Sequence, residues 1–106
     1  MRIIAGTHKG RKINPPNNLS VRPTTDKAKE ALLSIISNRY FFTNKNMLDL
    51  FAGTGSIALE FASRGIQETI AVDDSINCIN FITNTSKSFD LDITTIHSDG
   101  LTYTKK

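Results

Sequence analysis

The sequence predicts an α/β fold in which three parallel strands alternate with helices. Two observations carry this prediction. Strand-like and helix-like segments alternate from residue 46 onwards, with connections too long for hairpins, and such connections favour parallel strands joined by right-handed crossovers. In addition, the glycine-rich turn Gly53-Thr54-Gly55 joins the first of these strands directly to a helical pattern. That layout is typical of a nucleotide-binding strand-turn-helix unit.

The N-terminal residues predict a basic hairpin followed by an irregular linker. Residues 2–5 and 11–13 have the pattern of two short strands around a glycine-bounded turn. The segment Asn14-Pro15-Pro16-Asn17-Asn18 then interrupts any regular structure. We therefore separate residues 1–25 from a second unit, residues 26–106.

A helix is predicted to begin at Asp26. Apolar side chains at positions 28, 31, 32, 35 and 36 follow the spacing of an amphipathic helix, and we expect them to face the core. Thr25 or Asp26 can cap the N-terminus of this helix, and the acidic Asp26 and Glu30 suit the positive end of its dipole.

The remaining elements follow in the order strand, helix, strand, helix, strand. We expect strands over residues 47–51, 68–73 and 92–97, a helix over 55–64 closed by Gly65, a helix from Ser75 to about Phe89, and a last helical turn over 101–106. The candidate core contacts of the third helix are Ile76, Ile79, Ile82 and Phe89.

The composition is that of one small globular domain. The chain has 106 residues, of which 39% are hydrophobic and 22% charged, and these values are ordinary for such a domain. No apolar run approaches the ~18–20 residues of a membrane span, and the start lacks the apolar core of a signal peptide. We therefore expect no membrane partner. Cys78 is the only cysteine, which excludes an internal disulfide and favours a cytoplasmic setting.

Positive charge is concentrated at the N-terminus. Residues 1–30 hold seven basic and two acidic side chains, an excess of five positive charges. Residues 31–106 hold six basic and eight acidic side chains, so the net charge of +3 comes from the first segment alone. A basic arm on a mildly acidic body suggests a polyanionic partner, although a solvated surface hairpin has the same composition.

The glycine-rich turn is compatible with two classes of ligand. Gly53 to Ala58 fits the G-x-G-x-x-A pattern of dinucleotide-binding proteins, and Asp73 lies 20 residues beyond Gly53, where a carboxylate can bind ribose hydroxyls. Asp49 argues against a pyrophosphate, because two like charges a few ångströms apart in a partly dry cleft repel by on the order of several kcal/mol. A ligand with a positive amino group and a sulfonium, such as S-adenosylmethionine, would gain from the same carboxylate.

Two more acids follow the predicted strands. Asp99 comes directly after the third strand, where its carboxylate could accept from an adenine amino group, although Ser-Asp-Gly is also an ordinary turn sequence. Asp74 follows the second strand and is either a neighbour of the helix cap or a ligand contact.

Several segments resemble the bacterial RsmD family of S-adenosylmethionine-dependent methyltransferases, which act on a guanine N2 of 16S ribosomal RNA. They are MRIIAG at the start, GRK at 10–12, VRPTTDKAKEALL at 21–33, LDLFAGTGSIALE at 48–60 and AVDDS at 71–75. The resemblance covers nearly the whole chain. It implies a partial Rossmann-like class I methyltransferase fold preceded by a β-hairpin and a helix, with residues 26–106 as the N-terminal half of the cofactor-binding domain.

The resemblance also implies site residues. Those expected to line S-adenosyl-L-methionine are Asp49, Phe51, Ala52, Gly53, Thr54, Gly55, Asp73, Asp74, Ser98 and Asp99. Those expected to face RNA are Arg2, Lys9, Arg11, Lys12 and Arg22. No metal is implied. The implied partner is 16S ribosomal RNA or a small-subunit assembly intermediate.

Family members carry an Asn/Asp-Pro-Pro-Tyr/Phe loop after a fourth strand, where it orients the target amino group. We expect this loop beyond Lys106, so no catalytic residue is assigned and the chain alone is expected to be inactive. Asn14-Pro15-Pro16 begins the same motif, but Asn17 replaces the aromatic residue, which favours a linker.

Two alternatives to the methyltransferase remain. The chain could be a non-catalytic RNA-binding or ribosome-assembly module, or a fragment of a dinucleotide-binding oxidoreductase. In the usual strand order of this fold, strand one is central and pairs with a fourth strand that we expect beyond Lys106. The free edge of strand one, with Met47, Leu48, Leu50 and Phe51, therefore predicts self-association, strand exchange or marginal stability of the isolated chain.

Overall fold

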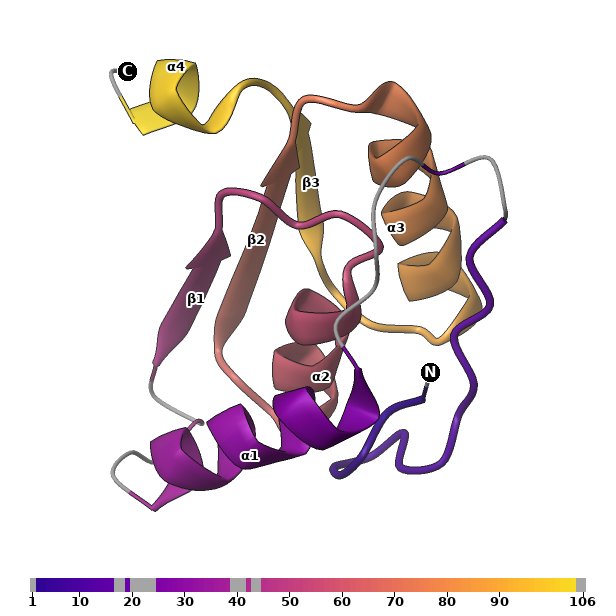
Figure 1. The fold of residues 1–106 in the computed structure, drawn as a ribbon, viewed down its shortest axis with the longest axis vertical. Coiled ribbons are helices and arrows are strands. Elements are labelled where there is room, and N and C mark those ends of the chain that lie inside the picture. The colour runs from indigo at the N-terminus through magenta and orange to yellow at the C-terminus, as the bar shows by residue number, and fades with distance from the viewer. Residues whose placement is uncertain (1, 17–18, 20–24, 39–41, 43–44, 105–106) are drawn as a thin grey trace.

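The computed structural model describes residues 2–16, 19, 25–38, 42 and 45–104. Its centre is a parallel sheet in the order β1-β2-β3, formed by Asn46–Asp49, Glu68–Asp73 and Thr94–His97. The α/β class and the parallel pairing are therefore confirmed. Helices α1, α2, α3 and α4 span Asp26–Ser37, Ser56–Ser63, Ile76–Ser88 and Gly100–Thr104, and Figure 1 shows α1 below the amino ends of the strands, next to α2.

Helices α2 and α3 cover the same face of the sheet. Ala58 of α2 and Ile82 of α3 both belong to a buried cluster with Ala71 of β2. This is the arrangement that two successive right-handed crossovers produce. A second buried cluster packs Ile3 and Ile13 of the N-terminal segment against Leu59 of α2 and against Phe89, which directly follows α3.

Helix starts agree with the expected caps. The side chain of Thr25 accepts a hydrogen bond from the Ala28 amide, and that of Ser75 accepts one from the Cys78 amide. Strand β1 is shorter than predicted because Asp49 Oδ1 accepts a hydrogen bond from the Phe51 amide, at 3.0 Å. Such an Asx turn bends the chain away from the sheet.

The predicted inner face of α1 is wrong. Leu32 and Ile35 are 45% and 59% exposed, whereas Lys29 and Leu33 are fully buried. The helix is thus rotated so that a lysine faces the interior. The predicted core of α3 is correct for Ile79, Ile82 and Phe89, but Ile76 at the first position of that helix is 48% exposed.

The N-terminal hairpin has less regular structure than predicted. One antiparallel bridge pairs Arg2 with Lys12, and backbone bonds join Ile3 to Arg11 and Gly10. Packing helps to hold the hairpin, because Ile3 and Ile13 are each only 1% exposed.

An exposed leucine and a hollow lie at β1. Leu48 is 49% exposed, and β1 ends the sheet on that side in the part of the chain that the structure describes. A hollow of about 360 Å³ lies beside it, lined by Ile36, Phe42, Lys45, Asn46, Met47, Leu48, Phe61 and Ile66. Among the described helices, none has the length and hydropathy needed to cross a membrane.

Candidate functional site

The glycine turn between β1 and α2 has a backbone that only glycine adopts easily. Gly53 and Gly55 have φ values of +56° and +79°. A Cβ on Gly55 would lie 2.7 Å from Cγ1 of Ile82, a distance that requires the neighbour to move. The turn therefore depends on glycine for both its conformation and its packing.

The turn opens into α2 without a side-chain cap. Gly55 is the N-cap residue, and it makes no side-chain hydrogen bond to the helix. The first amides of a helix have no partner within the helix and carry its positive dipole end. This geometry suits the polar groups of a small ligand.

Asp73 fixes the start of the turn. Its Oδ2 accepts a hydrogen bond from the Gly53 amide at 2.8 Å, and its Oδ1 accepts one from the Ser75 amide at 2.9 Å. A carboxylate offers about four lone-pair positions, so each oxygen keeps one for a further donor. The sequence predicted Asp73 only as a ribose ligand and missed its role in holding the turn. The spacing of 20 residues between Gly53 and Asp73 was the available signal for that role.

Asp49 lies at the end of β1 on the neighbouring strand. Burial raises the pKa of its carboxyl above the ordinary value, and the charge of Asp73 raises it further, while the hydrogen bond from the Phe51 amide opposes both effects. The ionised form of Asp49 is thus costly in the ligand-free protein. A cationic ligand would offset that cost.

The third strand brings a further acid to the same edge of the sheet. The Ser98 amide donates to the Asp73 carbonyl at 3.0 Å, so β3 ends beside β2. Asp99 is exposed, and its two carboxylate oxygens accept from the Leu101 amide and the Thr102 hydroxyl. It therefore caps α4, a role that its turn sequence indicated, and its predicted adenine contact stays a prediction.

The other expected cofactor residues lie on or beside the turn. Phe51 is 75% exposed, Ala52 and Thr54 are buried, and Asp74 is exposed. His97, which the sequence did not single out, ends β3, and its Nε2 pairs with the Asp74 carbonyl at 3.0 Å.

Residues 1–106 match a family model described as Conserved hypothetical protein 95. The chain belongs to this family. A Bacillus subtilis relative named "Putative rRNA methyltransferase YlbH" is 38% identical over 91 residues, 86% of this chain and 48% of the relative. The Escherichia coli "Ribosomal RNA small subunit methyltransferase D" is 39% identical over 64 residues, 60% of this chain and 31% of the relative. The resemblance to the RsmD family is confirmed.

Solved structures support the same fold. An Escherichia coli protein named "Putative methyltransferase yhhF" superposes with a TM-score of 0.84 at 22% identity, over 97% of this chain and 55% of that one. The Haemophilus influenzae "putative methylase HI0767" gives 0.76 at 25% identity, over 99% and 55%. The chain spans about half the length of the first relative and a third of the second.

In this member of the Conserved hypothetical protein 95 family, four of the five expected RNA-facing residues are exposed. They are Arg2, Lys9, Arg11 and Lys12. Arg22 lies outside the described residues. The Arg11 guanidinium lies 4.3 Å from the centre of the Phe89 ring, and His8 stacks on the same ring. The hairpin is thereby anchored to the end of α3.

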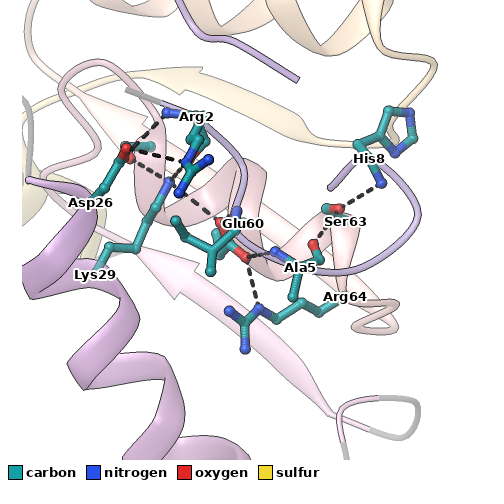
Figure 2. A network of polar contacts seen from close by, with 10 residues as sticks. Arg2, Ala5, His8, Asp26, Lys29, Glu60, Ser63 and Arg64 are labelled. Carbon is teal, nitrogen blue, oxygen red and sulfur yellow. Dashed lines mark hydrogen bonds and ion pairs between the residues drawn. The ribbon is translucent and has the colours of Figure 1, made fainter. Parts of the chain in front are cut away.

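A buried network holds the hairpin against α1 and α2. Lys29 and Glu60 are both fully buried, with 3.3 Å between Nζ and Oε1, and Arg64 Nε donates to Glu60 Oε2 at 2.8 Å. Figure 2 shows these side chains converging beneath the hairpin. Lys29, which the sequence counted with the basic arm, is therefore not part of a surface for a polyanion.

Proposed function

We propose that this chain is the methyl-donor-binding part of an S-adenosylmethionine-dependent methyltransferase that modifies a guanine N2 of 16S ribosomal RNA. The observation that carries the proposal is the half-buried Asp49 beside Asp73 and the glycine turn, with its raised pKa. S-adenosylmethionine supplies an activated methyl group when it is bound. The activity, the substrate and the RNA partner belong to the whole protein and are part of the proposal.

The described residues fit this cofactor. Asp49 would interact with the positive charge of the methionine end, which relieves the cost of burying its carboxylate. Asp73 would accept from ribose hydroxyls with the lone pairs that Gly53 and Ser75 leave unused. The glycine backbone of the turn would lie against the ligand.

The remaining cofactor residues complete the proposal. Phe51, Ala52 and Thr54 would border the methionine and sugar, Ser98 and Asp99 would lie near the adenine, and Asp74 would contact the ribose. Asp99 would have to combine that contact with its two bonds to α4.

Calorimetry with S-adenosylhomocysteine tests the cofactor site. We expect the purified chain to bind it and Asp49→Asn to weaken binding, whereas Asp92→Asn, an exposed acid just before β3, should bind as the wild type does. No heat at millimolar ligand would contradict the proposal. Tighter binding of NADH would instead favour the dinucleotide-binding alternative.

The exposed hairpin favours RNA as the partner of this unit. Its cations would bind phosphates, which supply affinity and position rather than base choice. We expect Lys12→Gln to weaken binding to a 16S RNA fragment and to lower the slope of log affinity against log salt by about 1. Lys27→Gln, an exposed lysine on α1, is the charge-matched control, and equal losses in both variants would refute a hairpin interface.

A second comparison distinguishes the RNA-binding alternative from the methyltransferase. If the chain is only an RNA-binding or assembly module, Asp49→Asn and Asp73→Asn will leave RNA affinity intact and wild type will bind no S-adenosylhomocysteine. If the chain is part of a methyltransferase, the wild type will bind S-adenosylhomocysteine.

A further inference from the structure

One buried ammonium group contacts both the N-terminal hairpin and helix α2, which follows the glycine turn. Lys29 Nζ donates to the Arg2 carbonyl at 2.7 Å and to Ser56 Oγ at 3.0 Å, and it pairs with Glu60. Figure 2 shows Lys29 reaching from α1 to this cluster beside α2. A charge in such a site is retained only with several partners, because desolvation is costly.

Ser56 connects this cluster to the glycine turn. It is the first residue of α2 and directly follows Gly55. Its side chain is 3% exposed and its hydroxyl is engaged by Lys29, so it does not face a ligand at the open end of the sheet. Its backbone nevertheless belongs to the first turn of α2, which is part of the proposed donor site.

The turn is braced by its own backbone and by one side chain. The Gly55 amide donates to the Ala52 carbonyl at 2.8 Å, and the Ala52 amide donates to the Val72 carbonyl at 3.0 Å. Asp73 holds the Gly53 amide at one end, whereas the N-cap at the other end is a glycine without a capping side chain. Glycine backbones have more conformational freedom than others. The bond from Lys29 to Ser56 adds a side-chain constraint at the end of the turn where the N-cap has none.

The same cluster holds the hairpin. Glu60 Oε1 accepts from the Ile4 amide at 2.8 Å, and Oε2 accepts from the Ala5 amide at 3.0 Å. The hairpin backbone and the start of α2 are thus both set by one buried ion pair. Ser63 adds a further contact, since its hydroxyl donates to the Ala5 carbonyl at 2.8 Å.

We propose that Lys29 is a positioning residue for the donor turn and that it acts through the Ser56 hydroxyl. This inference rests on the proposed donor site. It assigns the buried lysine a role besides stability: Lys29 fixes the orientation of the α2 amides that would meet the cofactor, and it links their position to the docked hairpin.

Ser56→Ala tests the link without touching the ion pair, and Ser86→Ala is the matched control. Ser86 is also a buried serine, but its hydroxyl donates to the Thr83 carbonyl within α3. We expect Ser56→Ala to weaken S-adenosylhomocysteine binding by up to about tenfold, the limit reached if the full free energy of this hydrogen bond orders the donor turn. The control should bind as the wild type does. Its urea midpoint should lie above that of Ser56→Ala, because Ser56→Ala takes one acceptor from a buried ammonium.

Amide hydrogen exchange in the ligand-free chain is the second measurement. We expect faster exchange at Gly53 and Gly55 in Ser56→Ala but not in the control. A chain that binds no S-adenosylhomocysteine would refute the donor site, and the exchange rates would still decide whether Lys29 positions the turn. Unchanged exchange at both glycines would overturn the inference.

A double-mutant cycle separates positioning from general loosening. If Lys29 acts through Ser56, Lys29→Met combined with Ser56→Ala will lose no more ligand affinity than Lys29→Met alone. Additive losses would show that the two residues act independently and would overturn the inference. Where Lys29→Met does not fold, the comparison of Ser56→Ala with its control decides.

Discussion

Glu60→Gln is the substitution from which we expect the largest loss of stability among single polar changes in the described chain. The Glu60 carboxylate is fully buried and has four polar partners, the amides of Ile4 and Ala5 and the charged groups of Lys29 and Arg64. Glutamine keeps the shape but carries no charge. Its amide nitrogen would also point a donor at groups that are themselves donors.

The expected cost follows from burial. Breaking a buried ion pair by removing one partner costs about 3–5 kcal/mol, because the other charge stays buried without compensation. A domain of this size has a free energy of unfolding of about 5–15 kcal/mol, so the loss is a large share of the total. By contrast, Arg2 and Asp26 form a pair at 3.7 Å whose side chains are 62% and 36% exposed, and such a pair is worth about 0–1 kcal/mol.

Urea unfolding at 25 °C, followed by far-UV circular dichroism, measures the difference. With a slope of about 2 kcal/mol per molar urea, Glu60→Gln should lower the midpoint by about 2 M. Asp26→Asn makes the same chemical change at the exposed pair and should lower it by about 0.5 M or less. Equal midpoints for the two variants would refute the reasoning. If Glu60→Gln does not fold, Lys29→Met provides the comparison, with a smaller loss because Arg64 still balances Glu60.

Three further predictions concern the turn and the sheet edge. Asp49→Asn should raise the urea midpoint at pH 7, because burial raises the pKa of Asp49 and makes its ionised form costly in the folded protein. The gain should vanish below the ordinary aspartate pKa of about 3.9, where Asp49 is protonated in both the folded and the unfolded protein. No gain at pH 7 would contradict this. Gly55→Ala should cost about 1–3 kcal/mol in urea unfolding, since its Cβ would lie 2.7 Å from Ile82. Gly10→Ala has a similar φ with nothing within 4 Å and should cost less. We propose that the chain self-associates through β1, so Leu48→Lys should shift sedimentation velocity profiles towards monomer, and a monomeric wild type would exclude this edge as an interface.

The central strand-turn-helix unit could be predicted from the sequence because its signals are local. The apolar run before Gly53, the glycine spacing and the helical pattern after Gly55 all lie within one short segment, and β2 has the predicted bounds Glu68–Asp73. The end of β1 could not be placed as well. It depends on which hydrogen bond the Asp49 side chain makes, and an aspartate at a strand end is compatible with more than one.

The inner face of α1 could not be predicted because it depends on a partner far along the chain. Periodicity assigns apolar side chains to the core, but here the interior position belongs to Lys29, whose partner Glu60 lies on another helix. One signal was available. Glu60 is the only charged residue in α2, whose sequence is SIALEFAS, and an isolated acid in an apolar helix indicates a buried counter-charge.

The buried lysine also changes how the N-terminal charge should be interpreted. The excess of five positive charges in residues 1–30 suggested a polyanionic partner for the basic arm, but Lys29 is buried against Glu60 and does not reach the surface. The exposed cations of the described hairpin are Arg2, Lys9, Arg11 and Lys12. Arg2 forms a weak exposed pair with Asp26, and Arg11 is held over Phe89. The proposed RNA interface is therefore limited to these exposed cations. The buried Lys29–Glu60 pair fixes the hairpin backbone that carries them, because Glu60 accepts from the Ile4 and Ala5 amides.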